Sequence, residues 1–471
     1  MKDYRQDRDN IHELIRQFLQ LRAGKPATFL DEEAFDKIID YYDENEDLAL
    51  AMEAAEAGIE RFPYSSQLLL RKADLLIATR KYQEALQLLD YIELLDATDI
   101  NIYILKTDAY LALDEQEKAV RLLENALTLF QGEDKKELLF ELADVYEDYE
   151  EFEKIFDCLK LILEEDPGNE EALYKICFWT DFTGRNEESI QLHTKIIDEV
   201  PYNELAWFNL GAAYQGLKLY EKAIDAYKYA VAIDEKFDYA YRNMGDAYIR
   251  LRQYREAIEV LERVLELSRP EDVIFEAIGY CYEKLKNYAQ ARFYYKKASH
   301  LNQEESRLVY KIACTYMYEN QWATAAQKLE YALKMPGSSL DCSLAMGECL
   351  MQLGNYREAI HHFSLVIRNR PKNIQSWESL IRCLYYGEFY DEALEQVVAA
   401  RKLTSNKPVF LYYQSAINLA SGRFKEGLLF LEAALETAPR SLKKFISLDP
   451  SLLQHQQVVD LVARYRKNIR S

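Results

Sequence analysis

The chain has 471 residues, a formal net charge of −22 and 49% apolar residues. That length would suit about three ordinary domains. The acidic balance disfavours nucleic-acid phosphate as a partner. No apolar run approaches the roughly 18 residues of a membrane-spanning helix.

The first 31 residues predict a capping helix. The opening MKDYRQDRDN is charged and lacks an apolar core, so we expect no secretory signal there. The stretch 11–21, IHELIRQFLQL, has apolar residues at helical spacing.

From residue 32 onward, a pattern returns every 34 residues. Large apolar residues recur at repeat positions 4, 7, 11 and 24, small residues at 8, 20 and 27, and proline often at 32. One step, from Ile100 to Lys136, is longer by two residues, which fit the turn at 131–134. The twelve repeats begin at Glu32, Ser66, Ile100, Lys136, Glu170, Glu204, Asp238, Asp272, Ser306, Leu340, Ile374 and Pro408.

Each repeat predicts two amphipathic helices. Small residues let the two helices approach closely, and the proline stops the second helix. One repeat buries too little alone, so neighbours must complete its core. Lys72, Lys106 and Gln414 occupy apolar position 7. We expect looser contacts there, with the lysine stems packed and their charged ends in water.

The pattern over residues 32–441 resembles the tetratricopeptide repeat (TPR) family. The resemblance implies an all-α fold, a right-handed alpha-alpha superhelix or TPR solenoid of about 24 repeat helices with N- and C-terminal capping helices. We divide the chain into a capping helix at 1–31, four acidic repeats at 32–169, eight repeats at 170–441 and a C-terminal capping helix at 442–471. Asp449-Pro450 suits a helix start, and the apolar residues after it would cover the last repeat. The cationic end suits a helix C-terminus or a binding tail; it comprises Arg464, Arg466, Lys467 and Arg470.

The charge is concentrated near the N-terminus. Residues 1–170 carry 19 Lys and Arg against 42 Asp and Glu, whereas the remainder carries 39 against 38. In the family, positions 2, 5, 9, 12 and 13 tend to line a concave groove. Position 9 of the first four repeats is Asp40, Asp74, Asp108 and Asp144. These carboxylates would attract a Lys/Arg-rich segment, although they also fit a solvated helix face.

Later groove positions are aromatic or polar. Exposed aromatic and Arg residues are typical of protein-binding hot spots, although some also fit packing between repeats. Asn209 and Asn243 share position 6, where some TPR proteins hold a peptide backbone. The candidate contacts are Tyr174, Phe178, Phe208, Asn209, Arg242, Asn243, Arg382 and Tyr385.

No motif in the sequence predicts a catalytic or metal-binding site. The seven cysteines lack paired spacing and suit free thiols in a reducing compartment. The six histidines lack metal-ligand spacing. We therefore expect no enzyme, no cofactor and no metal, and a cytoplasmic location.

The function expected is a scaffold that binds a protein or peptide segment in the groove, with a Lys/Arg-rich partner at the N-terminal repeats. Nucleic acid and membrane insertion are not expected, and the oligomeric state stays open. The alternatives are a peptide-responsive regulatory receptor and a self-associating or assembly subunit of a larger complex.

Overall fold

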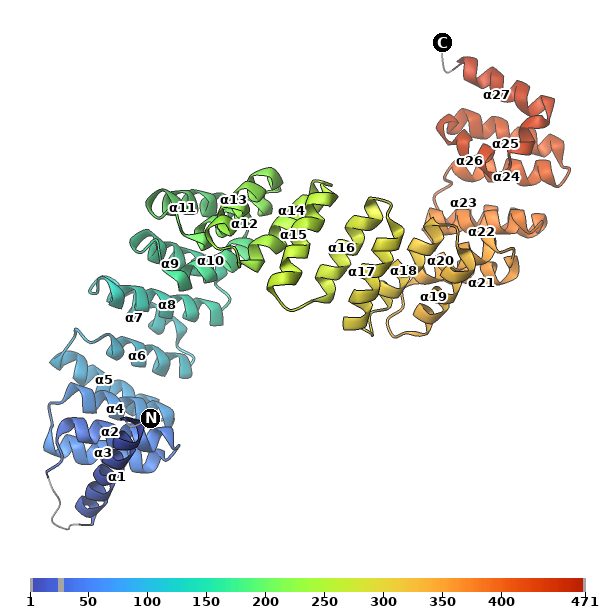
Figure 1. Ribbon diagram of the computed structural model, residues 1–471. Coiled ribbons are helices and arrows are strands. Elements are labelled where there is room, and N and C mark those ends of the chain that lie inside the picture. The colour runs from blue at the N-terminus through green and yellow to red at the C-terminus, as the bar shows by residue number, and fades with distance from the viewer. Residues whose placement is uncertain (1–2, 24–28, 469–471) are drawn as a thin grey trace. The chain divides into compact units, whose positions relative to one another are not determined.

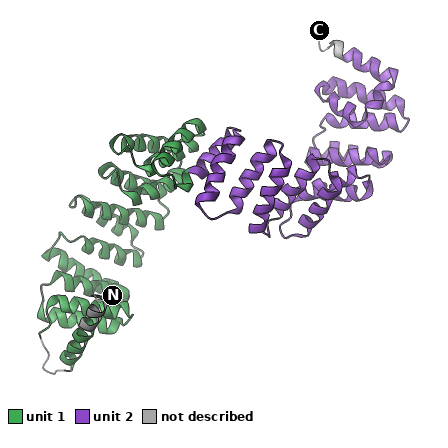
Figure 2. Ribbon diagram, in the orientation of Figure 1, with its two compact units in different colours: residues 1–240 green, residues 241–471 purple. Residues whose placement is uncertain are grey.

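The structure is a computed structural model that describes residues 3–23 and 29–468. Over these ranges the chain forms 27 α-helices and two 3₁₀ turns and contains no strand (Figure 1). The chain divides into two compact units, residues 1–240 and 241–471 (Figure 2). Side chains are described for residues 11–23 and 29–465, so the predicted basic residues Arg466, Lys467 and Arg470 lie outside them. The boundary predicted at 169/170 depends on the difference in charge between the first four repeats and the later ones, and it stays a prediction.

The helices follow one another in antiparallel pairs. The first unit contains α1 (Asp3–Arg22), α2 (Glu32–Glu44), α3 (Leu48–Arg61), α4 (Ser66–Ala78), α5 (Tyr82–Leu95), α6 (Ile100–Ala112), α7 (Gln116–Ala126), α8 (Glu133–Asp148), α9 (Phe152–Glu165), α10 (Glu170–Thr183), α11 (Asn186–Glu199), α12 (Glu204–Gly216) and α13 (Tyr220–Ile233). Helix α14 (Asp238–Arg250) contains the division.

The second unit continues the same alternation. It contains α15 (Tyr254–Leu267), α16 (Asp272–Lys284), α17 (Tyr288–Leu301), α18 (Ser306–Tyr318), α19 (Trp322–Lys334), α20 (Leu340–Gln352), α21 (Tyr356–Asn369), α22 (Ile374–Tyr386), α23 (Tyr390–Leu403), α24 (Val409–Ala420), α25 (Phe424–Thr437), η1 (Pro439–Ser441), α26 (Leu442–Leu448), η2 (Pro450–Gln454) and α27 (Gln456–Asn468). Helices α2 to α25 are the 24 repeat helices, so the predicted fold class is confirmed.

Ten repeats begin at the residue that the period predicts. The fourth differs because α8 begins at Glu133, after Gly132 with φ of 66°. Helix α7 ends early, at Ala126, so six residues separate α7 from α8 where four separate α5 from α6. The two additional residues therefore lengthen this turn. The last repeat begins one residue late because Pro408 is the N-cap of α24.

The turn inside each repeat places one residue in the left-handed region. That residue is always position 15, as at Glu46, Arg80 and Lys218, and it is glycine in only three repeats. The next amide closes the turn, since the Lys81 N–H donates to the Leu76 carbonyl at 2.8 Å. This is the Schellman arrangement, which satisfies carbonyls at the end of a helix.

In the four repeats with glycine at position 8, that glycine fits closely against the side chain at position 24. A Cβ added at Gly211 would lie 2.5 Å from the ring of Tyr227, a side chain that is fully buried. Alanine at position 20 is also fully buried in most repeats, as at Ala223. The predicted pairing of small and large residues is therefore confirmed.

The prediction for Lys106 is wrong. Its side chain is only 4% exposed, and its ammonium forms ion pairs with Asp90 and Glu93 at the end of α5. The two carboxylates outweigh burial and raise the pKa of Lys106. The charged end is held by protein and not by water, whereas Lys72 is 28% exposed beside Glu56.

First helices of successive repeats pack on one another in two runs within the first unit, from α2 to α8 and from α10 to α12; we call these helices the first-helix layer. Contacts join α2 to α4, α4 to α6 and α6 to α8, and α10 to α12. The capping helix α1 packs on α2, where Phe18 is 1% exposed. No helix in the described ranges is long and apolar enough to cross a membrane. The first-helix layer carries most of the predicted binding residues.

Candidate protein-binding surface

The four predicted aspartates lie on four successive first helices. Asp40 is on α2, Asp74 on α4, Asp108 on α6 and Asp144 on α8. Neighbouring carboxylates influence one another, because Asp74 contributes to raising the pKa of Asp108. We call Asp40, Asp74, Asp108 and Asp144, together with Glu141, the acidic stripe.

Both ends of the acidic stripe are neutralised by the chain itself. Arg71 on α4 places Nη2 2.6 Å from Asp40 and Nε 2.8 Å from Asp36. At the other end, Lys175 on α10 lies 3.5 Å from Asp144 and 5.1 Å from the ring centroid of Phe140. Both cations occupy position 6 of the repeat that follows the aspartate, so position 9 of one repeat faces position 6 of the next.

The middle of the acidic stripe lacks such cations. Position 6 is Leu105 in the third repeat and Glu141 in the fourth. In the described part of the chain, Asp108 and Glu141 form no ion pair. Burial, followed by the charges of Asp108 and Asp144, raises the pKa of Glu141 to about 7. Burial, followed by the charge of a neighbouring carboxylate, likewise raises the pKa of Asp74 and of Asp108, because both effects disfavour the charged form.

Glu141 is a site residue that the sequence prediction omitted. It occupies position 6, which the family resemblance did not assign to the acidic row. The relation between position 9 and position 6 of the next repeat would have identified it, but that relation depends on how the repeats stack.

A cleft lies beside the acidic stripe between α4 and α6. Its volume is about 550 Å³, and Arg71, Asp74 and Asp99 supply its charged lining. Leu70 and Leu105 supply part of its apolar lining. The cleft therefore offers a carboxylate and an apolar wall to one bound side chain.

Beyond Asp144 the predicted contacts become aromatic. Tyr174 and Phe178 on α10 are 62% and 61% exposed. We call Phe152, Phe178, Trp179 and Phe182 the aromatic cluster, in which the Phe152 and Phe182 rings lie 4.8 Å apart at their centroids. Phe178 lies 4.9 Å from Trp179 and 6.0 Å from Phe182.

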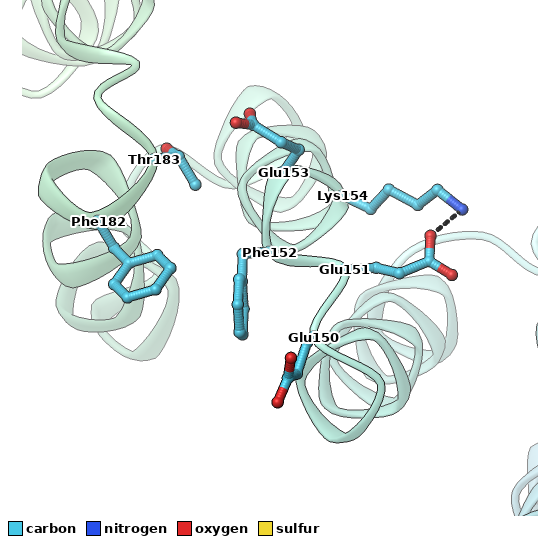
Figure 3. A pocket seen from close by; sticks show the side chains of 7 residues that line it. All are labelled: Glu150, Glu151, Phe152, Glu153, Lys154, Phe182 and Thr183. Carbon is cyan, nitrogen blue, oxygen red and sulfur yellow. Dashed lines mark ion pairs between the residues drawn. The ribbon is translucent and has the colours of Figure 1, made fainter.

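The aromatic cluster borders a second cleft, of about 400 Å³. In Figure 3, Phe152 from α9 and Phe182 from α10 project into the same space, and the Glu151–Lys154 ion pair lies to one side. Glu150 and Glu153 also line the cleft. An apolar wall with carboxylates at its rim suits an apolar side chain flanked by a cation.

Asn209 does not line an open surface, contrary to the prediction. It is 2% exposed, and its amide donates to the Leu173 carbonyl at 2.8 Å and lies 3.2 Å from Nε2 of His193. His193 Nδ1 lies 2.8 Å from the Ser189 carbonyl, which can only accept, so Nδ1 carries the proton. Burial lowers the pKa of His193 to about 4. Asn209 thus ties α12 to α10 and α11.

The remaining predicted contacts are more enclosed than expected. Phe208 is half-buried and packs on Phe237, with ring centroids 5.0 Å apart. Arg242 is held by both carboxylate oxygens of Glu271, at 2.8 and 2.9 Å. Asn243 and Arg382 are half-buried.

Tyr385 is only 6% exposed. Its hydroxyl donates to Asp449 at 2.7 Å, so the chain's own C-terminal segment covers it.

The described side chains hold no group of three or more His, Cys, Asp or Glu residues arranged for a metal ion. The seven cysteines are free. Burial raises the pKa of Cys158 and of Cys383 to about 12. These thiols therefore stay protonated at neutral pH.

Three family models match parts of the chain. Two tetratricopeptide repeat models match residues 37–99 and 316–382, and the tetratricopeptide repeat protein 21 C-terminal ARM domain matches residues 187–336. No curated protein matches the sequence.

Several solved structures resemble the chain at low identity. The APC/C hetero-tetramer Cut9–Hcn1 is 12% identical, covers 85% of this chain and 96% of its own, and has a TM-score of 0.36. The C-terminal part of a TPR protein from Cytophaga hutchinsonii is 16% identical, with 54% and 99% covered and a TM-score of 0.44. YrrB, a TPR protein with an unusual peptide-binding site, is 20% identical, with 47% and 97% covered and a TM-score of 0.29. On its 34-residue helix pairs and the matching repeat models, the chain belongs to the tetratricopeptide repeat family.

Proposed function

We propose that this protein is a non-catalytic interaction scaffold that binds a basic segment of a partner protein on the first-helix layer of residues 32–183. The observation that supports this proposal most is that Asp108 and Glu141, in the middle of the acidic stripe, form no ion pair in the described part of the chain. Arg71 and Lys175 neutralise the aspartates at its ends, whereas Asp108 faces Glu141. A Lys or Arg side chain from a partner would supply the missing cation there.

The aromatic cluster extends the proposed surface. Lys175 lies where the acidic stripe ends and aromatic side chains begin, since it contacts Asp144 on one side and the ring of Phe140 on another. Tyr174 and Phe178 follow on α10 and are mostly exposed. A bound segment would thus carry Lys or Arg at the acidic stripe and aromatic or aliphatic side chains at the aromatic cluster.

A binding measurement with designed peptides tests this proposal. The probe is a labelled peptide whose lysines precede phenylalanines, compared with the reversed order and with each half alone. The variant carries Asp74→Asn, Asp108→Asn and Glu141→Gln. The control removes three carboxylates on the second helices, through Glu84→Gln, Glu164→Gln and Glu187→Gln, all at exposed residues.

We expect the stripe variant to lose most of its affinity for the probe and much of the salt dependence of binding, while the control retains both. Equal losses of affinity in the two variants would contradict the proposal, because the probe would then respond to the net charge of the chain and not to the acidic stripe. The affinity of the unmodified chain should also rise as pH increases through about 7, because Glu141 then ionises.

Self-association is the second candidate function, since the described surface exposes apolar side chains such as Leu94 and Tyr202, at 86% and 83%. Light scattering over a range of concentrations separates a constant mass from an increasing one.

A further inference from the structure

After the last repeat, the chain turns back across the repeats that precede it. Helix α26 and the η2 turn both contact α24, and α26 is labelled beside α24 in Figure 1. The Tyr386 hydroxyl on α22 donates to the Leu448 carbonyl at 3.2 Å. We call residues 442–454 the return segment.

The return segment lies on residues that occupy groove positions of the repeat. Tyr385 and Tyr386 are positions 12 and 13 of the eleventh repeat, and Tyr412 is position 5 of the twelfth. Tyr412 donates to the Ala438 carbonyl at 3.0 Å, just before the return segment. By contrast, Tyr318 at position 13 of the ninth repeat is 55% exposed.

One side of the return segment is apolar and buried. Leu442, Phe445, Leu448 and Leu452 are 8%, 1%, 4% and 3% exposed, and they share one core cluster with Tyr385, Tyr412 and Tyr413. The spacing of three residues places the first three on one helix face.

The other contacts of the return segment are polar and lie at its edge. Lys444 forms an ion pair with Glu378 at position 5 of the eleventh repeat, and Asp449 accepts from Tyr385 at 2.7 Å. An amphipathic segment that binds in a groove buries an apolar strip in this way and makes a few polar contacts at its edge.

We propose that the first-helix face of the last two repeats is a peptide-docking site, and that the return segment is its built-in occupant. A partner segment with the same pattern displaces it: three apolar residues spaced by three, a Lys before the second, and an Asp after the third. This proposal concerns the second compact unit and does not depend on the acidic stripe.

Displacement requires little of the fold to open. Helix α26 has seven residues and could not persist alone in water, and the segment on either side of it is 3₁₀ or irregular. Releasing it breaks contacts to α22 and α24 but separates no repeat from its neighbour. Such local opening costs less than global unfolding.

Because the return segment is joined to the last repeat by the chain itself, it competes strongly with a partner segment for the docking site. A segment joined by a short link acts at an effective concentration on the order of millimolar. A partner segment can bind only those chains in which the return segment has left the docking site. Its apparent affinity is therefore its intrinsic affinity multiplied by the fraction of such chains.

The test uses the full chain and a labelled synthetic peptide of residues 439–455, measured by fluorescence anisotropy. Phe445→Ala with Leu448→Ala weakens the internal segment, and Lys443→Ala, at an exposed residue of the same helix, is the matched control. We expect the double variant to bind the peptide about tenfold more tightly or better, and the control to behave as the unmodified chain. Adding Tyr386→Ala to the double variant should weaken binding again.

Hydrogen exchange of the unmodified chain gives a measurement that does not depend on the variants. Amides of 442–448 should exchange faster than those of α22 and α24. Equal exchange rates, or a double variant that takes up no peptide while α24 loses protection, would overturn the proposal and make the return segment part of the permanent core. A mass that doubles with concentration would overturn intramolecular occupancy in favour of a second copy's segment.

Discussion

Glu141 shows how one residue can change the character of a surface. It lies half-buried on α8, at the position where other repeats place Arg71 or Lys175. Because the carboxyl is partly buried and because Asp108 and Asp144 are its neighbours, its pKa is raised and it holds its proton at an unusually high pH. The same residue is the one that a partner's cation would ionise.

The stability of the chain should therefore depend on Glu141 between pH 4.5 and 7. Its pKa is raised from 4.5 to about 7, so in this window the folded state holds a proton that the unfolded state has lost. Stability then falls as pH increases through the window. Urea unfolding at pH 5 and pH 7.5 should show a smaller difference in Glu141→Gln than in the unmodified chain. The control Glu147→Gln, at an exposed residue of the same helix, should leave that difference unchanged.

Gly211 tests the packing rule inside a repeat. A methyl group there would lie 2.5 Å from the buried ring of Tyr227, so Gly211→Ala should destabilise the chain by about 1–3 kcal/mol. At Gly168 the added Cβ would meet only Asp166 Oδ1, at 3.8 Å. Gly168→Ala should cost much less in the same thermal or urea unfolding measurement. A similar cost at both sites would contradict the packing explanation.

At the scale of the element, the helix pair depends on its turn. Position 15 is left-handed in every repeat, yet most repeats place a charged or polar side chain there. An L-residue in this region costs about 1–2 kcal/mol, and the Schellman bonds impose the conformation. Sequence pattern alone did not identify these positions, because charged residues give no turn signal.

Replacing such a residue by glycine should stabilise the chain. Arg80 has φ of 61° and is exposed, so Arg80→Gly should gain up to about 1 kcal/mol in chemical unfolding. Arg80→Ala keeps the Cβ and should gain nothing. A loss of stability in the glycine variant would mean that the long side chain contributes more than the backbone strain costs.

At the scale of the whole molecule, a solenoid is joined only by contacts between neighbours. Opening should therefore occur by region and not throughout the chain. The free cysteines report on this, since two lie in the first compact unit and five in the second. Six of the seven have a pKa raised to about 11 or 12 by burial.

Thiol labelling followed by mass spectrometry should show that pattern. At pH 8 and low denaturant we expect slow labelling, with Cys158 and Cys177 modified as one group and Cys281, Cys349 and Cys383 at different rates. Labelling of all seven at one rate would indicate a single cooperative transition. A fully denatured sample, in which every thiol reacts at once, is the control.

The repeat, the family, and the first residue of most first helices could be predicted from the sequence alone. A period of 34 residues specifies which side chains meet inside one repeat, because both partners, such as Gly211 and Tyr227, recur in the pattern. It also identified the row of aspartates at position 9. Groove binding and the partner's basic character stay predictions.

Which residues face each other between repeats follows from the stacking of the helices and could not be predicted from the sequence. The opposition of Asp108 and Glu141 depends on how one first helix stacks on the next, and the burial of Asn209 depends on His193 reaching it from α11. The return segment lies outside the repeat, so no period describes its path over Tyr385. Local propensity and spacing act within a repeat, whereas these contacts depend on where the stacked backbones place each side chain.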